Sequence, residues 1–104
     1  MPMFLIANRA PKGYQDSAES FAAWSSWFER LGDSLMDRGN PVLGERASLG
    51  NCGGDTELGG YTLVAANDLD TAIALSRGCP RLVEGGGVEI GELTIVNEGN
   101  QLAK

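Results

Sequence analysis

Residues 58–80, LGGYTLVAANDLDTAIALSRGCP, predict a β-strand that continues directly into a capped helix. The strand is expected over residues 61–66, where β-prone side chains follow a Gly-Gly pair and neither face is strongly polar. A strand of this kind is usually covered on both faces. Asp68 then has the side chain and the position of a helix N-cap, and Gly78 and Pro80 are typical of a helix end.

Two more elements are expected upstream of this unit. Residues 3–7, MFLIA, are too few for a helix and predict a buried central strand. A long helix is expected to open at Asp16, which has the spacing of a capping box with Glu19, and to run over residues 17–38 until Gly39 and Pro41 stop it. Such a helix would be about 33 Å long.

The predicted helix carries aromatic and aliphatic residues at steps of three and four. This narrow stripe predicts the face that packs on a sheet, and it is interpreted as core rather than as a cofactor box. Trp27 lies beside the stripe, so the pattern leaves it available for a pocket or an interface. The residues of the stripe are Phe21, Trp24, Phe28, Leu31 and Leu35.

The remaining segments complete a fold pattern. Residues 42–49 predict an irregular or edge strand, and residues 50–57 predict a loop. Residues 88–96 predict a final strand whose alternation slips near Gly91, where a bulge would restore one buried face. The order strand, helix, strand, strand, helix, strand predicts an α+β, ferredoxin-like βαββαβ domain over residues 1–104, with a four-stranded antiparallel sheet and two helices on one face.

The other face of that sheet would be bare in a monomer. The two strands predicted at residues 3–7 and 61–66 are apolar on both sides, and a monomer rarely exposes an apolar patch beyond a few hundred square ångströms. We therefore expect a homodimer in which the two sheets pack face to face.

Composition limits the classes of partner and compartment. The 104 residues have a formal net charge of −6, which disfavours nucleic acid and anionic membrane surfaces as partners. No apolar run approaches the roughly 20 residues of a membrane helix, and no secretory signal is expected at the start. Cys52 and Cys79 do not form a disulfide framework, so a reducing, cytoplasmic location is expected.

The chain contains no histidine. This excludes a Ser-His-Asp triad, a Cys-His dyad, a histidine general base and any histidine-ligated metal. We expect neither a metal nor a cofactor.

Four motifs carry a resemblance to a known family. They are Leu58-Gly59-Gly60-Tyr61, the helix start Asp68-Leu69-Asp70-x-Ala72-Ile73, Gly78-Cys79-Pro80, and Val88-Glu89-Ile90-Gly91-Glu92. Together they resemble the YCII-related family of small bacterial proteins over the second half of the chain, while the first half agrees in element order and in its aromatic helix. The resemblance implies a ferredoxin-like fold in a dimeric α/β barrel, and a biochemical role that is mostly unassigned. Some members are dehydrochlorinase-like or have been suspected of acting through a His–Asp pair, and others lie beside or are fused to sigma-factor-like regulators.

The sequence departs from this family in two places. Without a histidine, the His–Asp chemistry does not carry over. The family's Asp-Gly-Pro-Phe signature is also missing, and the corresponding region lies near residues 54–57. Both departures weigh against an enzymatic assignment.

The candidate ligand-binding residues are Asn8, Arg9, Gly59, Gly60 and Tyr61. The two glycines would let a ligand approach the backbone, with the Tyr61 hydroxyl as a donor; alternatively they only start a strand and Tyr61 packs. Asn8 and Arg9 follow the first strand, where Arg9 could hold a carboxylate, or else they belong to a solvated loop.

The candidate catalytic residues are Asp70 and Tyr61. Asp68 and Asp70 are two apart on a helix start, so their side chains diverge, and capping and dipole effects also explain them. Cys79 lies at a helix C-terminus, where the dipole disfavours a thiolate, which favours a packing role.

Three functions stay open. The first is a small homodimeric ligand-binding or accessory protein. The second is a cofactor-independent enzyme that catalyses an elimination, isomerisation or oxygenation of a small organic molecule, with Asp70, Tyr61 or Arg9 as polar catalysts. The third, a regulatory partner of a transcription factor, is implied only by the family resemblance.

Overall fold

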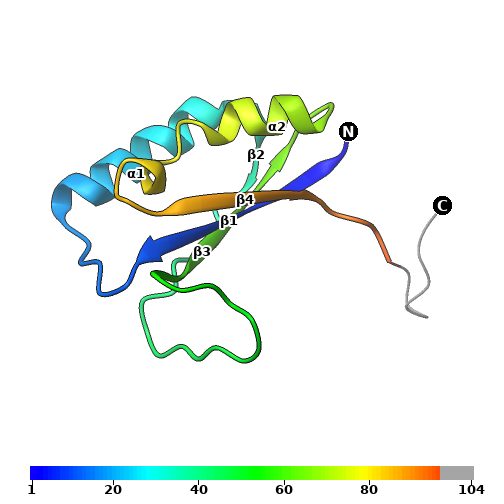
Figure 1. The fold of residues 1–104 in the computed structure, drawn as a ribbon. Coiled ribbons are helices and arrows are strands. Elements are labelled where there is room, and N and C mark those ends of the chain that lie inside the picture. Colours follow the sequence, from blue (N-terminus) through cyan, green and yellow to red (C-terminus); the bar gives the residue numbers. More distant parts are fainter. Residues whose placement is uncertain (97–104) are drawn as a thin grey trace.

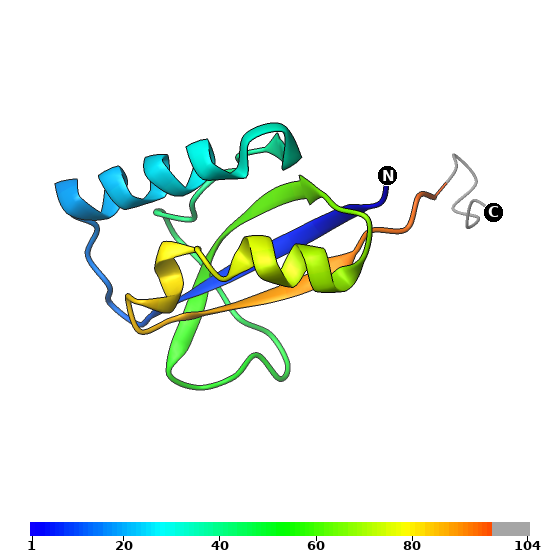
Figure 2. The same ribbon diagram turned by 90° about the horizontal axis from the view of Figure 1, so that it is seen from above.

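The computed structural model of the chain describes residues 1–96 and has the predicted ferredoxin-like α+β arrangement. The elements that follow the βαββαβ order are β1 (Met3–Pro11), α1 (Ala18–Leu31), β2 (Leu35–Asp37), β3 (Thr56–Ala65), α2 (Leu69–Ser76) and β4 (Gly87–Glu92). The strands form one antiparallel sheet in the order β2-β3-β1-β4. Both helices lie on one side of the sheet, and the long β2–β3 loop extends on the other side (Figure 1). From above, α2 crosses over β1 and β4 (Figure 2).

The core lies between the helices and the central strands. Alternate β1 residues, including Phe4, Ile6 and Asn8, point under the helices and are buried. Val64 of β3 and Ala72 of α2 close the same core. The intervening β1 residues project from the sheet face that has no helix.

Helix α2 forms as the sequence predicts. The Asp68 side chain is the N-cap and accepts a hydrogen bond from the Thr71 backbone N–H at 2.8 Å. This bond lowers the pKa of the Asp68 carboxyl. After α2 a short 3₁₀ helix, Pro80–Leu82, leads toward β4.

Helix α1 differs from its prediction at both ends. Its N-cap is Ser17, whose Oγ accepts from the Ser20 backbone N–H at 3.1 Å, so the capping box based on Asp16 is wrong. The helix ends at Leu31 because Gly32 has a φ of 54°, a backbone conformation that cannot continue an α-helix. A 3₁₀ turn, Gly32–Ser34, follows. Leu35 therefore belongs to β2 and not to the helical stripe.

The helix is also rotated relative to the predicted stripe. Trp27 is 1% exposed and Phe21 is 55% exposed, so the interpretation of Trp27 as a pocket or interface residue is wrong. The Trp27 indole N–H donates to the Leu75 carbonyl oxygen at 3.0 Å. A Cβ on Gly78 would lie 3.0 Å from the indole ring, so the missing side chain at Gly78 leaves room for Trp27 against the end of α2.

The strands correct three further expectations. Residues 42–49 form no strand, because β2 is a three-residue strand that directly follows α1; only Pro41 bridges to Gly60 beyond it. Strand β3 begins at Thr56, five residues before the predicted start. The register of β4 on β1 is unbroken through Gly91, so the bulge predicted there is wrong; the irregularity lies between β1 and β3, where Gly59 is the extra residue.

Candidate ligand-binding site

A cleft of about 290 Å³ opens between helix α1, the segment after β2 and the helix side of the sheet. Three aromatic rings of α1 form its apolar wall, and two arginines and two asparagines supply most of its hydrogen-bond donors. This volume lies at the lower limit of the roughly 300–1,000 Å³ typical of small-molecule sites. Its lining residues include Asn8, Trp24, Phe28, Arg38, Tyr61 and Arg81.

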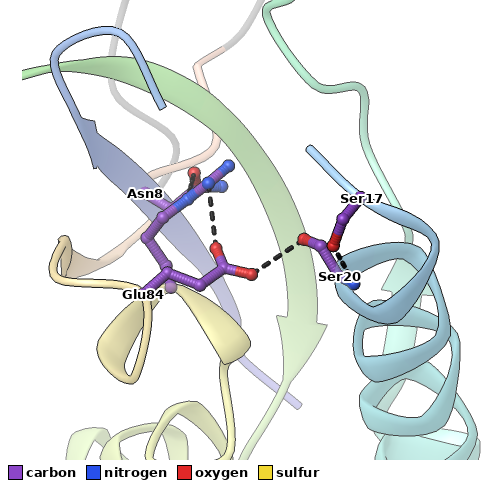
Figure 3. A network of polar contacts seen from close by, with 5 residues as sticks. Asn8, Ser17, Ser20 and Glu84 are labelled. Atoms are coloured by element: carbon purple, nitrogen blue, oxygen red, sulfur yellow. Dashed lines mark hydrogen bonds and ion pairs between the residues drawn. The ribbon is translucent and has the colours of Figure 1, made fainter. Parts of the chain in front are cut away.

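The floor of the cleft is a buried polar network around Arg81. The Arg81 Nε donates to Asn8 Oδ1 at 2.9 Å, and its Nη1 pairs with Glu84 Oε1 at 3.0 Å. The second Glu84 oxygen accepts from the Ser20 hydroxyl at 2.8 Å, which connects the network to the first turn of α1 (Figure 3). Charged groups that are buried, paired and hydrogen-bonded on several sides are held in one orientation.

Two aromatic rings lie near the same guanidinium. The Arg81 Cζ lies 5.3 Å from the centroid of Trp24 and 5.6 Å from that of Tyr14. These are cation–π distances, and Arg81 itself is only 5% exposed.

Gly59 provides the space that the network occupies. A Cβ at this bulge position would collide with Asn8 Oδ1 and would lie 3.2 Å from Arg81 Nη2. The sequence predicts that a ligand approaches the backbone here, whereas the groups that lie against Gly59 in the structure are the chain's own Asn8 and Arg81.

The structure separates the sequence-predicted site residues into two groups. Asn8, Gly59 and Tyr61 line the cleft, and the Tyr61 hydroxyl lies 3.4 Å from its donor, Asn40 Nδ2. Gly60 is buried next to Gly59 and packs against Asn40 and Pro41.

Arg9 and Asp70 lie outside the cleft. Arg9 projects from the other sheet face, where its Nε donates to Thr56 Oγ1 at 2.8 Å and its Nη2 donates to the Cys52 carbonyl oxygen at 3.0 Å. Asp70 is exposed in the first turn of α2. Neither residue is among those that line the cleft.

The two arginines of the cleft were not predicted from the sequence, and its aromatic wall was predicted to be core. Arg38 stacks over Phe28, with its Cζ 4.9 Å from the ring centroid. One signal for Arg81 was present: an arginine inside the apolar run from Cys79 to Val83, with Glu84 three residues later as a partner. Arginine is seldom fully buried unless it is paired.

Outside the cleft, one thiol in the described part of the chain has a strongly shifted pKa. Burial raises the pKa of the Cys79 thiol to about 11, so at neutral pH it is a protonated packing residue, as the sequence predicts. Within residues 1–96, no three acidic or cysteine side chains converge in a way that would hold a metal ion. The same residues include no helix of the length and apolarity that crossing a bilayer requires.

The fold and the cleft define a ferredoxin-like α+β protein with a small, aromatic-walled cavity beneath its first helix. No family model and no curated protein sequence matches the chain. A solved structure that resembles it is the 5-chloro-2-hydroxyhydroquinone dehydrochlorinase TftG from Burkholderia phenoliruptrix AC1100, in complex with 2,5-dihydroxybenzoquinone. The two agree with a TM-score of 0.65 at 22% identity, over 95% of this chain and 99% of that chain. At this identity the likeness shows the shared fold.

Proposed function

We propose that this protein is a YCII-like protein that binds a small organic molecule in the cleft beneath α1. The observation that carries the proposal is the combination, in one small cavity, of an aromatic wall with a buried arginine held by Asn8 and Glu84. A buried ion pair is a poor way to stabilise a fold, because desolvation offsets most of the attraction between the charges. Recognition of a ligand explains why Arg81 is buried at the floor of a cavity.

The two tryptophans allow a direct test. Trp24 lines the cleft, whereas Trp27 is buried in the core, so Trp27→Phe leaves one fluorescent reporter at the site. We expect members of a panel of one-ring aromatic compounds to change the fluorescence of Trp27→Phe in a saturable way. The matched variant Trp24→Phe should show no saturable change with the same compounds. Equal changes in both variants, or none in Trp27→Phe, would contradict binding at this cleft.

The proposal includes a homodimer in the cytoplasm. The sheet face without helices carries apolar side chains along β1 and β3, which supports self-association through that face. Both cysteines are free thiols, which supports a reducing compartment. Cys52 is exposed and Cys79 is buried.

A cofactor-independent enzyme acting in the same cleft is the second candidate. Its support is the fold shared with a dehydrochlorinase. Of the predicted catalytic residues only Tyr61 lies at the cleft, so turnover of a bound ligand should be lost in Tyr61→Phe while binding is retained. A regulatory role beside a transcription factor has the family resemblance as its only support.

A further inference from the structure

The Arg81 guanidinium has one nitrogen left for a ligand. Its Nε and Nη1 are used by Asn8 and Glu84, while Nη2 makes no hydrogen bond within residues 1–96. Within these residues every fully enclosed side-chain nitrogen or oxygen has a hydrogen-bond partner. Nη2, which has none, is therefore not fully enclosed. Arg81 lines the cleft and also a neighbouring pocket next to Tyr14, and the inference assigns its Nη2 to the cleft.

Two guanidinium groups at the cleft can donate hydrogen bonds to an anion. Arg38 and Arg81 line it together with a single carboxylate, Asp16. Glu84 is the partner of Arg81, and its second carboxylate oxygen accepts a hydrogen bond from the Ser20 hydroxyl. This bond holds the Glu84 carboxylate away from the ligand space. With Glu84 counted beside its partner, the formal charges at the cleft cancel, so the case for an anion depends on the guanidinium donors of Arg38 and Arg81 and not on a net positive charge.

The shape and walls of the cleft favour a flat, one-ring ligand. The Trp24 and Phe28 rings lie 5.9 Å apart, centroid to centroid, and both face the cavity with Phe21. Aromatic walls favour planar rings, and a volume of about 290 Å³ leaves room for little more than one substituted ring.

We propose that the ligand is a planar, one-ring organic anion, whose acid group accepts from Arg81 Nη2 while its ring packs on Trp24 and Phe28. This rests on the proposed small-molecule function and specifies its ligand class. Two chemistries supply such an anion: an aromatic carboxylate and a hydroxyquinone, whose ring hydroxyl is a vinylogous acid. Either presents oxygen atoms in the ring plane, which suits the planar donor geometry of arginine.

The first test compares acids with neutral isosteres on the full chain carrying Trp27→Phe, so that Trp24 reports binding. The probes are benzoate and salicylate, their amides benzamide and salicylamide, and 2,5-dihydroxybenzoquinone as the hydroxyquinone arm. We expect at least one anion arm to bind more than tenfold tighter than the neutral amides, and its affinity to fall as salt is added. Amides that bind as tightly as the acids would refute the anion inference but leave small-molecule binding intact. If no probe changes Trp24, the inference is wrong, and the broader panel decides separately on the proposed function.

The second test removes the cation. Arg81→Gln alone leaves Glu84 buried without its partner, so Arg81→Gln is combined with Glu84→Gln, and folding is checked by thermal unfolding. We expect the double variant Arg81→Gln/Glu84→Gln to abolish the preference for anions over amides. Arg38 is exposed, and we expect Arg38→Gln to weaken anion binding only about threefold. Arg77→Gln, at the end of α2 and outside the cleft, is the matched control and should change neither. An anion preference that survives in a folded Arg81→Gln/Glu84→Gln protein would overturn the assignment to Arg81.

Discussion

Gly59 is the residue on which both the sheet and the cleft floor depend. Its missing side chain leaves room for Asn8 Oδ1 and Arg81 Nη2 at the one bulge of the β1–β3 pair. We expect Gly59→Ala to destabilise the fold by about 1–3 kcal/mol, as an overpacked core does, and to weaken ligand binding by displacing Arg81. Urea unfolding and the Trp24 titration measure the two effects. Gly44→Ala, where a Cβ meets nothing within 4 Å, is the control and should change neither.

Cys79 gives a pH dependence with a defined sign. Burial raises the pKa of its thiol from 9.0 to about 11, so between these values the folded chain retains a proton that the unfolded chain has lost. The free energy of unfolding should therefore be unaffected by this group below pH 9 and should fall as the pH rises toward 11, by at most about 1.4 kcal/mol per pH unit.

The Cys79 prediction is measured by denaturant unfolding from pH 8 to pH 11. Cys79→Ala lacks the titrating thiol, so its free energy of unfolding should fall less steeply than that of the wild type over this range. Parallel pH profiles of the two proteins would show that the buried thiol does not contribute.

At the scale of the elements, the N-terminus of α1 depends on Ser17. Its hydroxyl accepts from the Ser20 N–H, whereas Asp16 precedes the cap and lines the cleft. We expect Ser17→Ala to destabilise the protein by about 1 kcal/mol in urea unfolding, and Asp16→Ala to have less than half that effect. If Asp16→Ala instead destabilised the protein more than Ser17→Ala, Asp16 would be the N-cap, as the sequence predicts.

Elements with strong local signals were predictable. Helix α2 has an aspartate cap, an apolar stripe and a glycine at its end, and it forms where these signals place it. The end of α1 was not predictable in this way, because Leu35 continues the helical spacing past Gly32. Strand β2, with only three residues, is defined by its pairing with β3 and not by its own sequence.

The candidate site shows the same limit. Asn8, Gly59 and Tyr61 were predicted because each has a local signal at or beside a strand, and they do line the cleft. Arg81 joins them only because the α2–β4 connection folds back beneath α1, a tertiary contact that no local pattern contains.

At the scale of the whole molecule, the two faces of the sheet differ in how they are covered. The helices bury Phe4, Ile6 and Val64 on one face. On the opposite face, Leu5 of β1 and Leu63 of β3 lie side by side, because they are direct partners in the β1–β3 pairing. A two-fold axis through this face would place the same apolar surface of a second copy against it.

We expect the purified protein to sediment as a dimer at micromolar concentration, because association removes this apolar surface from water. Leu63→Glu places a charge at the centre of the face and should give a monomer that keeps its secondary structure, as measured by sedimentation and circular dichroism. Leu69→Glu is the matched control, since Leu69 is an equally large side chain, 49% exposed on α2 and away from the open face, and it should leave the dimer intact. A wild-type protein that sediments as a single subunit would contradict the dimer but would leave the proposed cleft beneath α1 untouched, because that cleft is formed within one chain.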